Sequence, residues 1–426
     1  MLRESLKNSA GGKTLLLCGG LVGHLQHLYD NKDLTFHEIK SILRKAASGR
    51  LEKASEKMDG MNLVFSYNVE ESRVKVTRGS DIRSGGMDAS ALAAKFAGRG
   101  SVEEAFTTAF KVLDGALSAL SDRTKLKIFG PRANRWYSME VIYTSNPNVI
   151  NYDSNNIVFH GWPVFKREDD GTVEMTEDDA GGVDLLTNFV DRMQKSVSVK
   201  GWRVRGPAIV RMSKLSNGET LSETLAAIDA TIAEVGVGPS NTMGDFLRIH
   251  LRSDMEELGL SEDVEDALID YCLGIEGAMG LNAVKRMAEI SQRDAISQFA
   301  RSSPALLKSY VRPIELAIND FAVELLKGLE STLIDDTDRE VERLRGEVQN
   351  AITAIEASGD ETAMGVLKTQ MDKLKSVSNI TSPVEGVVFI YKGNAYKFTG
   401  SFASANAILG LFKYGRGGTK LKMPGK

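Results

Sequence analysis

The sequence has few cysteines, few histidines and no long apolar run, and these shortages exclude several classes of protein. Its 426 residues include only Cys18 and Cys272, which are far apart and argue against a secreted protein built on disulfides. The five histidines have no further Cys or His at a spacing suited to zinc. Residues 15–18, Leu-Leu-Leu-Cys, are too short to span a membrane, and no signal-peptide pattern accompanies them. We therefore expect a cytoplasmic protein without a membrane partner.

A complete P-loop is also missing. Residues 11–14 read Gly-Gly-Lys-Thr, but the full pattern needs a glycine five residues before Gly12, and Lys7 stands there. The spacing of the histidines gives no support for Ser-His-Asp catalysis either. Any nucleotide chemistry must therefore use another arrangement.

The net charge of −4 conceals two parts of opposite sign. Residues 217–378 hold 30 acidic and 15 basic residues, a net charge of −15. The rest of the chain holds 27 acidic and 38 basic residues, a net charge of +11. Because a basic surface attracts polyanions, we expect nucleic acid to bind the basic part. The acidic part is then a candidate surface for a protein partner.

The same boundaries appear in the pattern of expected elements. Residues 35–38, Thr-Phe-His-Glu, form a capping box that predicts a helix to about residue 47. Apolar residues recur every three or four positions over 341–355 and 364–377, which predicts a helical hairpin. Further helix is expected near 101–120, and strands are expected at 63–68, 73–78, 125–129, 138–143, 156–160 and 203–212. The chain thus predicts an α+β domain whose first part is 1–216, a large all-α insertion over 217–378, and the last strands and a basic tail over 379–426.

Residues 56–62, Glu-Lys-Met-Asp-Gly-Met-Asn, are the most informative segment. A lysine, one spacer and Asp-Gly precede an expected strand, an arrangement typical of a lysine nucleophile that attacks the α-phosphate of a nucleoside triphosphate. Such an amine must be deprotonated part of the time, so burial or a neighbouring cation has to lower its pKa. The alternative is an ordinary surface turn that carries a solvated Lys57.

A second group of residues lies at the far end of the chain. Residues 383–390 predict a buried strand introduced by Glu385, and residues 396–400 predict another strand that carries Lys397. Phosphoryl transfer depends mostly on positioning and on neutralising charge. We therefore assign Lys57 as nucleophile, Lys397 as the cation at the α-phosphate and Glu385 as a carboxylate for metal or substrate. The alternative is an antiparallel hairpin without chemistry.

The order of these motifs resembles the superfamily of ATP-dependent polynucleotide ligases and capping enzymes. Within it, Glu-Lys-x-x-Gly-x-Asn resembles the phage RNA ligases more than the DNA ligases. The resemblance implies a nucleotidyltransferase (ligase adenylation) domain with antiparallel sheets, ATP as AMP donor, Mg²⁺ or Mn²⁺, and AMP carried on Lys57. It implies Glu140 and Glu385 as metal ligands. The nucleotide-binding residues that it implies are His27, Glu56, Asp59, Gly60, Asn62, Arg78, Glu140 and Phe159. Among these, Glu140 would contact the ribose, Phe159 would stack on the purine, and His27 would line the base pocket.

Two departures from the family pattern bear on the joining of nucleic-acid ends more than on the transfer of a nucleotide to lysine. The last ligase motif usually has two lysines spaced by one residue, but Ala395 and Thr399 flank Lys397 here. One phosphate-binding cation is therefore missing or comes from elsewhere. Little chain follows this motif, so we expect no C-terminal domain of the kind many ligases use to hold nucleic acid. The basic tail over 413–426 could follow a nucleic-acid backbone or remain solvated.

We therefore expect an ATP-dependent RNA ligase that seals 5′-phosphate and 3′-hydroxyl ends through a lysyl-AMP intermediate, in the host cytoplasm if the protein is from a phage. RNA is favoured over DNA as partner. A DNA ligase and a capping-type guanylyltransferase remain alternatives. A hypothesis of another class is a non-catalytic interaction protein with a ligase fold, whose acidic helices recruit a partner.

Overall fold

The computed structural model describes residues 25–78, 82–146, 149–176, 181–210, 212–215, 218–327, 329 and 331–414. Within them the protein combines two sheets with many helices, which confirms the expected α+β class with antiparallel sheets. Several segments discussed above lie outside the described residues: 11–14, 15–18 and the tail from 415 onward.

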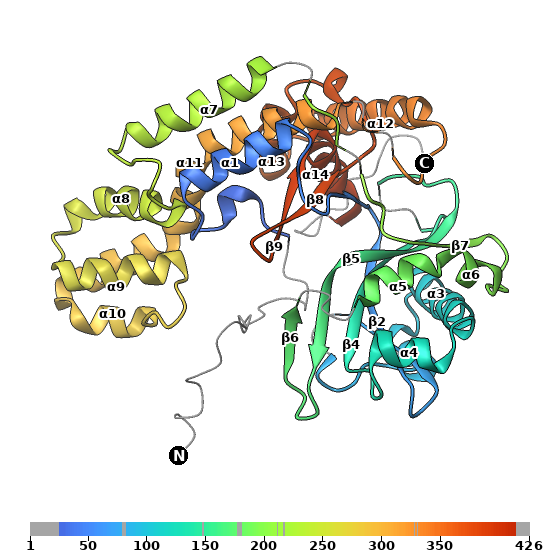
Figure 1. Ribbon diagram of the computed structural model, residues 1–426. Helices are drawn as coiled ribbons and strands as arrows, with labels where there is room; N and C mark the ends of the chain where they lie inside the picture. Colours follow the sequence, from blue (N-terminus) through green and yellow to red (C-terminus); the bar gives the residue numbers. More distant parts are fainter. Residues whose placement is uncertain are drawn as a thin grey trace.

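The strands form a larger sheet of six strands and a smaller sheet of three (Figure 1). The larger sheet has the order β3-β2-β4-β5-β6, and β7 pairs in parallel with β5 beside it. The smaller sheet has the order β1-β8-β9 and is antiparallel. The strands are β1 (Ser55–Lys57), β2 (Met61–Asn68), β3 (Arg73–Thr77), β4 (Arg135–Ile142), β5 (Asn155–Arg167), β6 (Val173–Thr176), β7 (Trp202–Arg205), β8 (Gly386–Tyr391) and β9 (Asn394–Thr399).

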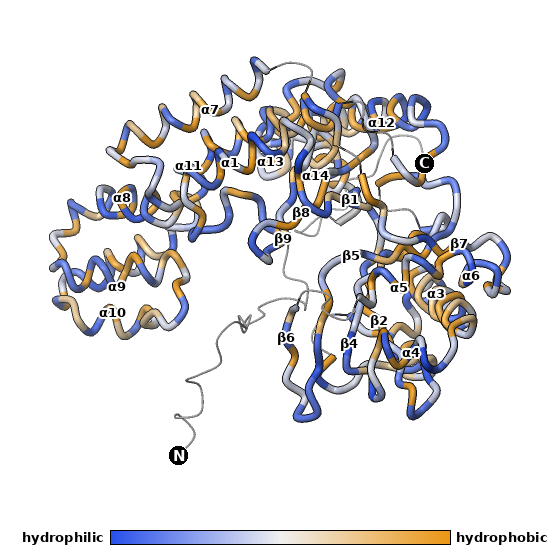
Figure 2. The backbone as a smooth tube through the Cα atoms, in the orientation of Figure 1, coloured by the Kyte–Doolittle hydropathy of each residue, from blue (hydrophilic) through white to orange (hydrophobic). Residues whose placement is uncertain are grey.

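The helices fall into two groups along the chain. The first group is α1 (Phe36–Ala47), α2 (Ala89–Phe96), α3 (Ser101–Ser118), α4 (Asp122–Phe129), α5 (Gly182–Asn188) and α6 (Val190–Lys195). The second group is α7 (Gly218–Ala233), α8 (Met243–Met255), α9 (Glu262–Leu273), α10 (Leu281–Met287), α11 (Arg293–Leu326), α12 (Thr337–Ser358), α13 (Glu361–Leu374) and α14 (Ser401–Tyr414). Polar and apolar stretches alternate along α7, α8 and α9, as amphipathic helices require (Figure 2).

The two faces of the larger sheet have different environments. Side chains alternate between the faces along each strand, and one set, which includes Phe65, Met139 and Phe159, packs into a core with helices α2 to α6. The opposite set includes Asn62 and Glu140. We call this second side the polar face, because it bears the buried polar residues discussed below.

The smaller sheet brings the start and the end of the domain together. Strand β1 pairs with β8, with Lys57 opposite Gly386, and β8 pairs with β9, with Val388 opposite Lys397. Residues directly opposite each other share a face, and so do residues two apart on one strand. Lys57 and Lys397 therefore lie on the same face of this sheet. The other face carries Phe389 among other aromatic residues and packs into a core with α1 and α11.

The helical segment follows the expected boundaries in the chain but does not form a separate core. It begins with α7 at Gly218, and strands resume with β8 at Gly386, close to the expected limits of 217 and 378. Helices α7 to α11 share one core with α1 and with β8 and β9. Helices α12 and α13 share another with Met58, Val158 and α14. The segment is therefore part of the packing of both sheets.

The local predictions are mostly confirmed. Thr35 caps α1, and its side chain and that of Glu38 form the reciprocal capping box. Helix α3 and the hairpin α12–α13 also appear where expected. The strand expected at 125–129 is wrong, because these residues belong to α4, whose N-cap Ser121 accepts a hydrogen bond from Thr124 N–H. No helix among the described residues is long and apolar enough to cross a membrane.

Candidate functional site

Lys57 and Glu385 form the centre of the candidate site. Lys57 ends β1 and Glu385 immediately precedes β8, so the pairing of Lys57 with Gly386 brings the two side chains together. The Lys57 ammonium lies 2.5 Å from Glu385 Oε2, and the two side chains are 22% and 12% exposed. Burial raises the pKa of Glu385, while the charges of Lys57 and Lys397 oppose that rise. The carboxylate is therefore a stronger base than an exposed glutamate.

Gly386 permits this close pairing. A Cβ atom on Gly386 would lie 2.2 Å from the backbone oxygen of Phe398 in the neighbouring strand. Only glycine fits between β1 and β9 at this point. The Glu-Gly sequence thus lets Glu385 lie beside Lys57.

Lys397 is the second cation on this face. Its side chain is half-buried, and no carboxylate of the described residues lies within ion-pair distance of it. Burial lowers the pKa of Lys397, and the charge of Lys57 lowers it further. A cation that is partly desolvated and has no ion-pair partner is stabilised when an anion binds beside it.

His27 lies next to these lysines, although it comes from the other end of the described chain. The N–H of Lys397 donates a 3.0 Å hydrogen bond to the carbonyl oxygen of Gln26, which places His27 beside β9. The imidazole stacks on Tyr29 at 4.9 Å between ring centroids. Burial and then the charges of Lys397, Lys373 and Lys57 lower the pKa of His27 to about 3. The ring is therefore neutral in a strongly positive environment.

The third lysine of this environment belongs to the helical segment. Lys373 of α13 lies 2.5 Å from Glu315 Oε1 of α11, and both side chains are largely buried. The Tyr29 hydroxyl also donates to Glu315, at 3.5 Å. These contacts connect Lys373 to the residues that surround His27. No sequence pattern indicated this lysine, since nothing distinguishes it from other polar positions of a helical hairpin.

Glu140 and Asn62 lie side by side on the polar face of the larger sheet. They are paired opposite each other on β4 and β2. Glu140 is largely buried, and its Oε2 lies 3.2 Å from His160 Nε2. Asn62 Nδ2 donates to Ser138 Oγ at 2.7 Å. The two residues that the resemblance assigns to nucleotide binding thus share one surface, and His160 joins them.

Gly60 lies where the chain passes between Lys57 and the larger sheet. A Cβ atom there would lie 2.6 Å from both Glu140 Cγ and Ile142 Cδ1. The glycine is therefore needed for packing against β4. This role requires no ligand.

Glu56 and Asp59 are occupied by contacts within the protein. Glu56 Oε2 accepts 2.7 Å hydrogen bonds from both the N–H and the hydroxyl of Thr332, and Oε1 accepts one from Ser331. Asp59 Oδ2 accepts hydrogen bonds from the N–H groups of Val149 and Ile150 at 2.7 and 2.9 Å. Both carboxylates therefore fix the backbone on either side of Lys57.

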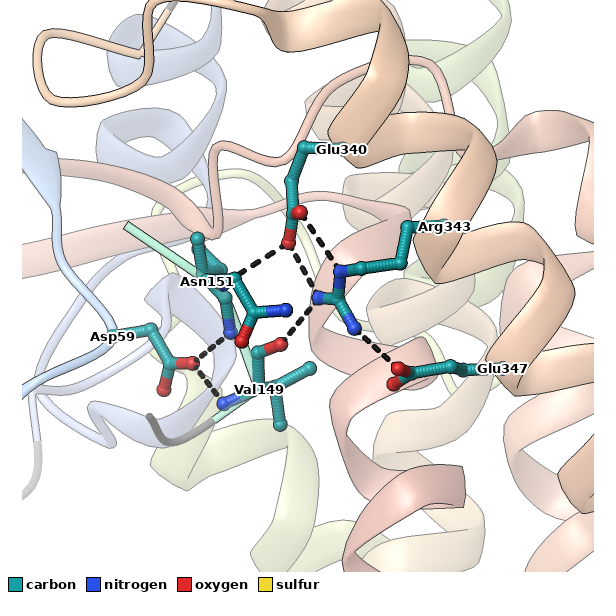
Figure 3. A network of polar contacts seen from close by, with 7 residues as sticks. Asp59, Val149, Asn151, Glu340, Arg343 and Glu347 are labelled. Carbon is teal, nitrogen blue, oxygen red and sulfur yellow. Dashed lines mark hydrogen bonds and ion pairs between the residues drawn. The ribbon is translucent and has the colours of Figure 1, made fainter. Parts of the chain in front are cut away.

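The loop held by Asp59 is in turn bound to α12 (Figure 3). Asn151 N–H donates to Glu340 Oε1 at 3.1 Å, and Arg343 Nη2 donates to the carbonyl oxygen of Val149 at 2.7 Å. Arg343 also pairs with Glu340 on the same helix. The helical segment therefore supports the turn that follows Lys57.

The structure places Phe159 and Arg78 away from this polar face, which corrects the expectations for both. Phe159 is 2% exposed and packs on Phe65 in the core under the helices, so its ring is not available to a purine. Strand alternation places its neighbour His160 on the polar face instead. Arg78 lies over the ring of Phe106 of α3, 5.4 Å from the centroid, on the helix-covered side. Its guanidinium therefore does not reach the phosphates or ribose of a nucleotide on the polar face.

Metal binding would depend on few protein ligands. No cluster of three or more His, Cys, Asp or Glu side chains suited to a metal occurs in the described part of the chain. Mg²⁺ is commonly held by one or two carboxylates together with substrate phosphates, and does not need a protein cage. Glu385 and Glu140 are compatible with that mode, since each is a carboxylate next to the expected nucleotide.

The structure therefore brings Lys57, Glu385, Lys397 and His27 together at the smaller sheet, and it places Glu140 beside Asn62 on the polar face of the larger sheet. Sequence reasoning missed Lys373, Glu315, Tyr29 and His160, which complete the surroundings. Comparisons of the chain with models of protein families, with curated proteins and with solved structures find no match.

Proposed function

We propose that the protein is an ATP-dependent nucleotidyltransferase that carries AMP on Lys57 and transfers it to RNA ends, as an RNA ligase does. The main support is the contact between Lys57 and Glu385 on a face that also carries Lys397. An amine, a buried carboxylate and a cation that has no ion-pair partner among the described residues suit nucleotidyl transfer to lysine.

In the first step the Lys57 Nζ attacks the α-phosphorus of ATP. A nitrogen–phosphorus bond forms, and the bond from that phosphorus to the pyrophosphate oxygen breaks. The ammonium must lose a proton before its nitrogen can attack, and Glu385 is the base nearest to it. The raised pKa of Glu385 favours this proton transfer.

Lys397 and Lys373 would hold the negative charge of the triphosphate. Lys397 shares the face of Lys57, which suits the α-phosphate. Lys373 then supplies the second cation, for which the strand positions Ala395 and Thr399 offer no charge. Release of Lys373 from Glu315 would accompany binding, because one ammonium cannot fully serve both anions. Bound Mg²⁺ would neutralise phosphate charge beside Glu385 and Glu140.

In the later steps the 5′-phosphate of an RNA would displace Lys57 from AMP. A 3′-hydroxyl would then attack that phosphate and expel AMP, which leaves a phosphodiester bond. The polar face, with Asn62 and Glu140, would hold the nucleoside throughout.

Intact mass spectrometry tests the first step. The protein is incubated with ATP and Mg²⁺, and we expect a gain of one AMP on Lys57. Lys57→Arg preserves a positive charge for Glu385 but removes a nucleophilic amine, so we expect no gain in mass. Lys111→Ala, on the exposed side of α3, is the matched control and should take up AMP as the wild type does.

The proposal fails if the wild-type mass is unchanged across pH and with either Mg²⁺ or Mn²⁺. That outcome would favour a non-catalytic interaction protein. Uptake of GMP in place of AMP would favour a capping-type guanylyltransferase, and a modified lysine other than Lys57 would refute the site.

A further inference from the structure

A groove of about 570 Å³, lined by both polar and apolar side chains, lies between β7 and Met58. Nothing in the proposed nucleotide site uses it. Its walls include Met58, Val158, Gln194, Arg203, Arg205 and Thr332. Met58 is the residue next to Lys57, so the groove opens beside the nucleophile strand.

The pairing of the strands puts both arginines on the polar face. Arg205 lies opposite Val158 in the pairing of β7 with β5, and Val158 lies opposite Glu140 in the pairing of β5 with β4. Glu140 lies opposite Asn62. One row of residues thus crosses four strands from Asn62 to Arg205. Because neighbouring strands are about 4.8 Å apart, Arg205 is about 10 Å from Glu140 across the sheet. Arg203, two residues earlier, points to the same side.

Arg205 is held in place by neutral groups. Its Nε donates to Asn156 Oδ1 at 3.0 Å, and its Nη1 donates to the carbonyl oxygen of Thr332 at 3.3 Å. Burial lowers the pKa of Arg205, the charge of Arg203 lowers it further, and Asp335 opposes the change. Among the described residues, neither arginine forms an ion pair with a carboxylate. One acidic residue, Asp191, also lines the groove.

The groove is connected to the nucleophile strand through two contacts. Thr332, which accepts from Arg205, also donates to Glu56, the residue before Lys57. The N–H of Glu56 donates at 2.9 Å to Ala208, three residues after Arg205. A phosphate bound at the arginines would therefore lie close to the strand that carries the proposed AMP.

We propose that this groove binds successive phosphates of the single-stranded RNA that receives the nucleotide from Lys57. This assignment rests on the proposed function. Two guanidinium groups at alternate positions of one strand offer a row of donors that suits phosphate oxygens. The lining also includes Ile209, which is 65% exposed and offers an apolar surface to bases.

Fluorescence anisotropy with a labelled, 5′-phosphorylated single-stranded RNA tests the proposal on the full-length protein without ATP. Arg203→Ala removes an exposed guanidinium, and we expect binding about tenfold weaker, the usual worth of one charged hydrogen bond. The slope of log affinity against log salt should fall by about 0.7 for the lost phosphate contact. Arg192→Ala removes the same charge from α6 at a position that does not line the groove, so this variant should bind as the wild type does. Thermal unfolding of both variants checks that they fold.

Equal weakening by the two substitutions would overturn the proposal, because it would show attraction by net charge alone. Unchanged binding by Arg203→Ala would also overturn it. Since ATP is absent, the result does not depend on Lys57. If the wild type binds RNA through Arg203 but never gains AMP, the groove would stand as an RNA-binding site and the proposed nucleotidyltransferase activity would be refuted.

Discussion

The neutral state of His27 predicts a loss of stability in acid that one substitution should remove. The pKa of His27 falls from its ordinary 6.5 to about 3 in the folded protein, because of burial and three nearby lysines. The unfolded chain therefore binds a proton below about pH 6.5, whereas the folded protein binds it only near pH 3. Above about pH 6.5, the pKa in the unfolded chain, His27 costs the wild type no stability. The free energy of unfolding decreases as the pH falls from there towards about 3, the pKa in the folded protein.

The magnitude follows from the width of the window. Each pH unit within it costs about 1.4 kcal/mol, so the wild type should lose about 3 kcal/mol between about pH 7 and pH 4 through His27 alone. His27→Gln has no such titration. The difference in unfolding free energy between the two proteins should change by that amount, because other titrating groups contribute to both and cancel. Loss of the contact with Tyr29 adds only a constant offset.

Urea unfolding at a series of pH values measures this difference. His37→Gln, which replaces an exposed histidine of α1, is the control and should follow the wild type at every pH. Parallel curves for the wild type and His27→Gln would refute the reasoning, since they would mean that the imidazole titrates alike in both states. The lysines would then not surround it as described.

Other substitutions test individual parts of the site. Lys397→Ala should slow AMP uptake by about two orders of magnitude or more, because the variant loses a fixed positive charge beside the α-phosphate. A near-normal rate in a quench assay would show that Lys397 does not stabilise the transfer. Lys373→Ala should raise the ATP concentration needed for half-maximal AMP uptake. Lys368→Ala, which removes an exposed lysine of the same helix, should not, and equal effects of the two substitutions would refute a specific contact of Lys373 with ATP. Gly60→Ala should lower the urea midpoint by a destabilisation of about 1–3 kcal/mol, because its Cβ overlaps Glu140; an unchanged midpoint would contradict this packing.

The sequence predicted those features that depend on local chemistry. The capping box at Thr35 and the strand that follows the turn after Lys57 depend on residues close in the chain. Lys57 and Glu385 were expected to meet because phosphoryl transfer needs a nucleophile beside a carboxylate, and the resemblance implied the same. In contrast, residues 125–129 alternate Lys-Leu-Lys-Ile-Phe as a strand would, and packing of Ile128 and Phe129 against the larger sheet accompanies their helical conformation.

Composition alone could not show which residues of a strand lie on which face of the sheet. Phe159 and His160 are both compatible with a ligand site, and only the pairing with β4 shows which of them lies on the face of Glu140. The role of Lys373 was equally hidden, because its position depends on how α11 and α13 pack. Nor could the sequence show that helices of the segment 217–378 share their cores with residues of the sheets. Both cores of that segment include residues of the sheets, so replacing it with a short linker would expose them.

The pairing of β1 with β8 has a consequence for synthesis. The strand that carries Lys57 emerges early from a ribosome, whereas its partner with Glu385 emerges after the whole helical segment. At ordinary translation rates the interval is on the order of tens of seconds. During it the nascent chain has a lysine but neither the base nor Lys397, and closing so long a loop is itself slow. On the proposed function, the site would therefore form only when the last strands arrive, and a chain truncated before them should not take up AMP.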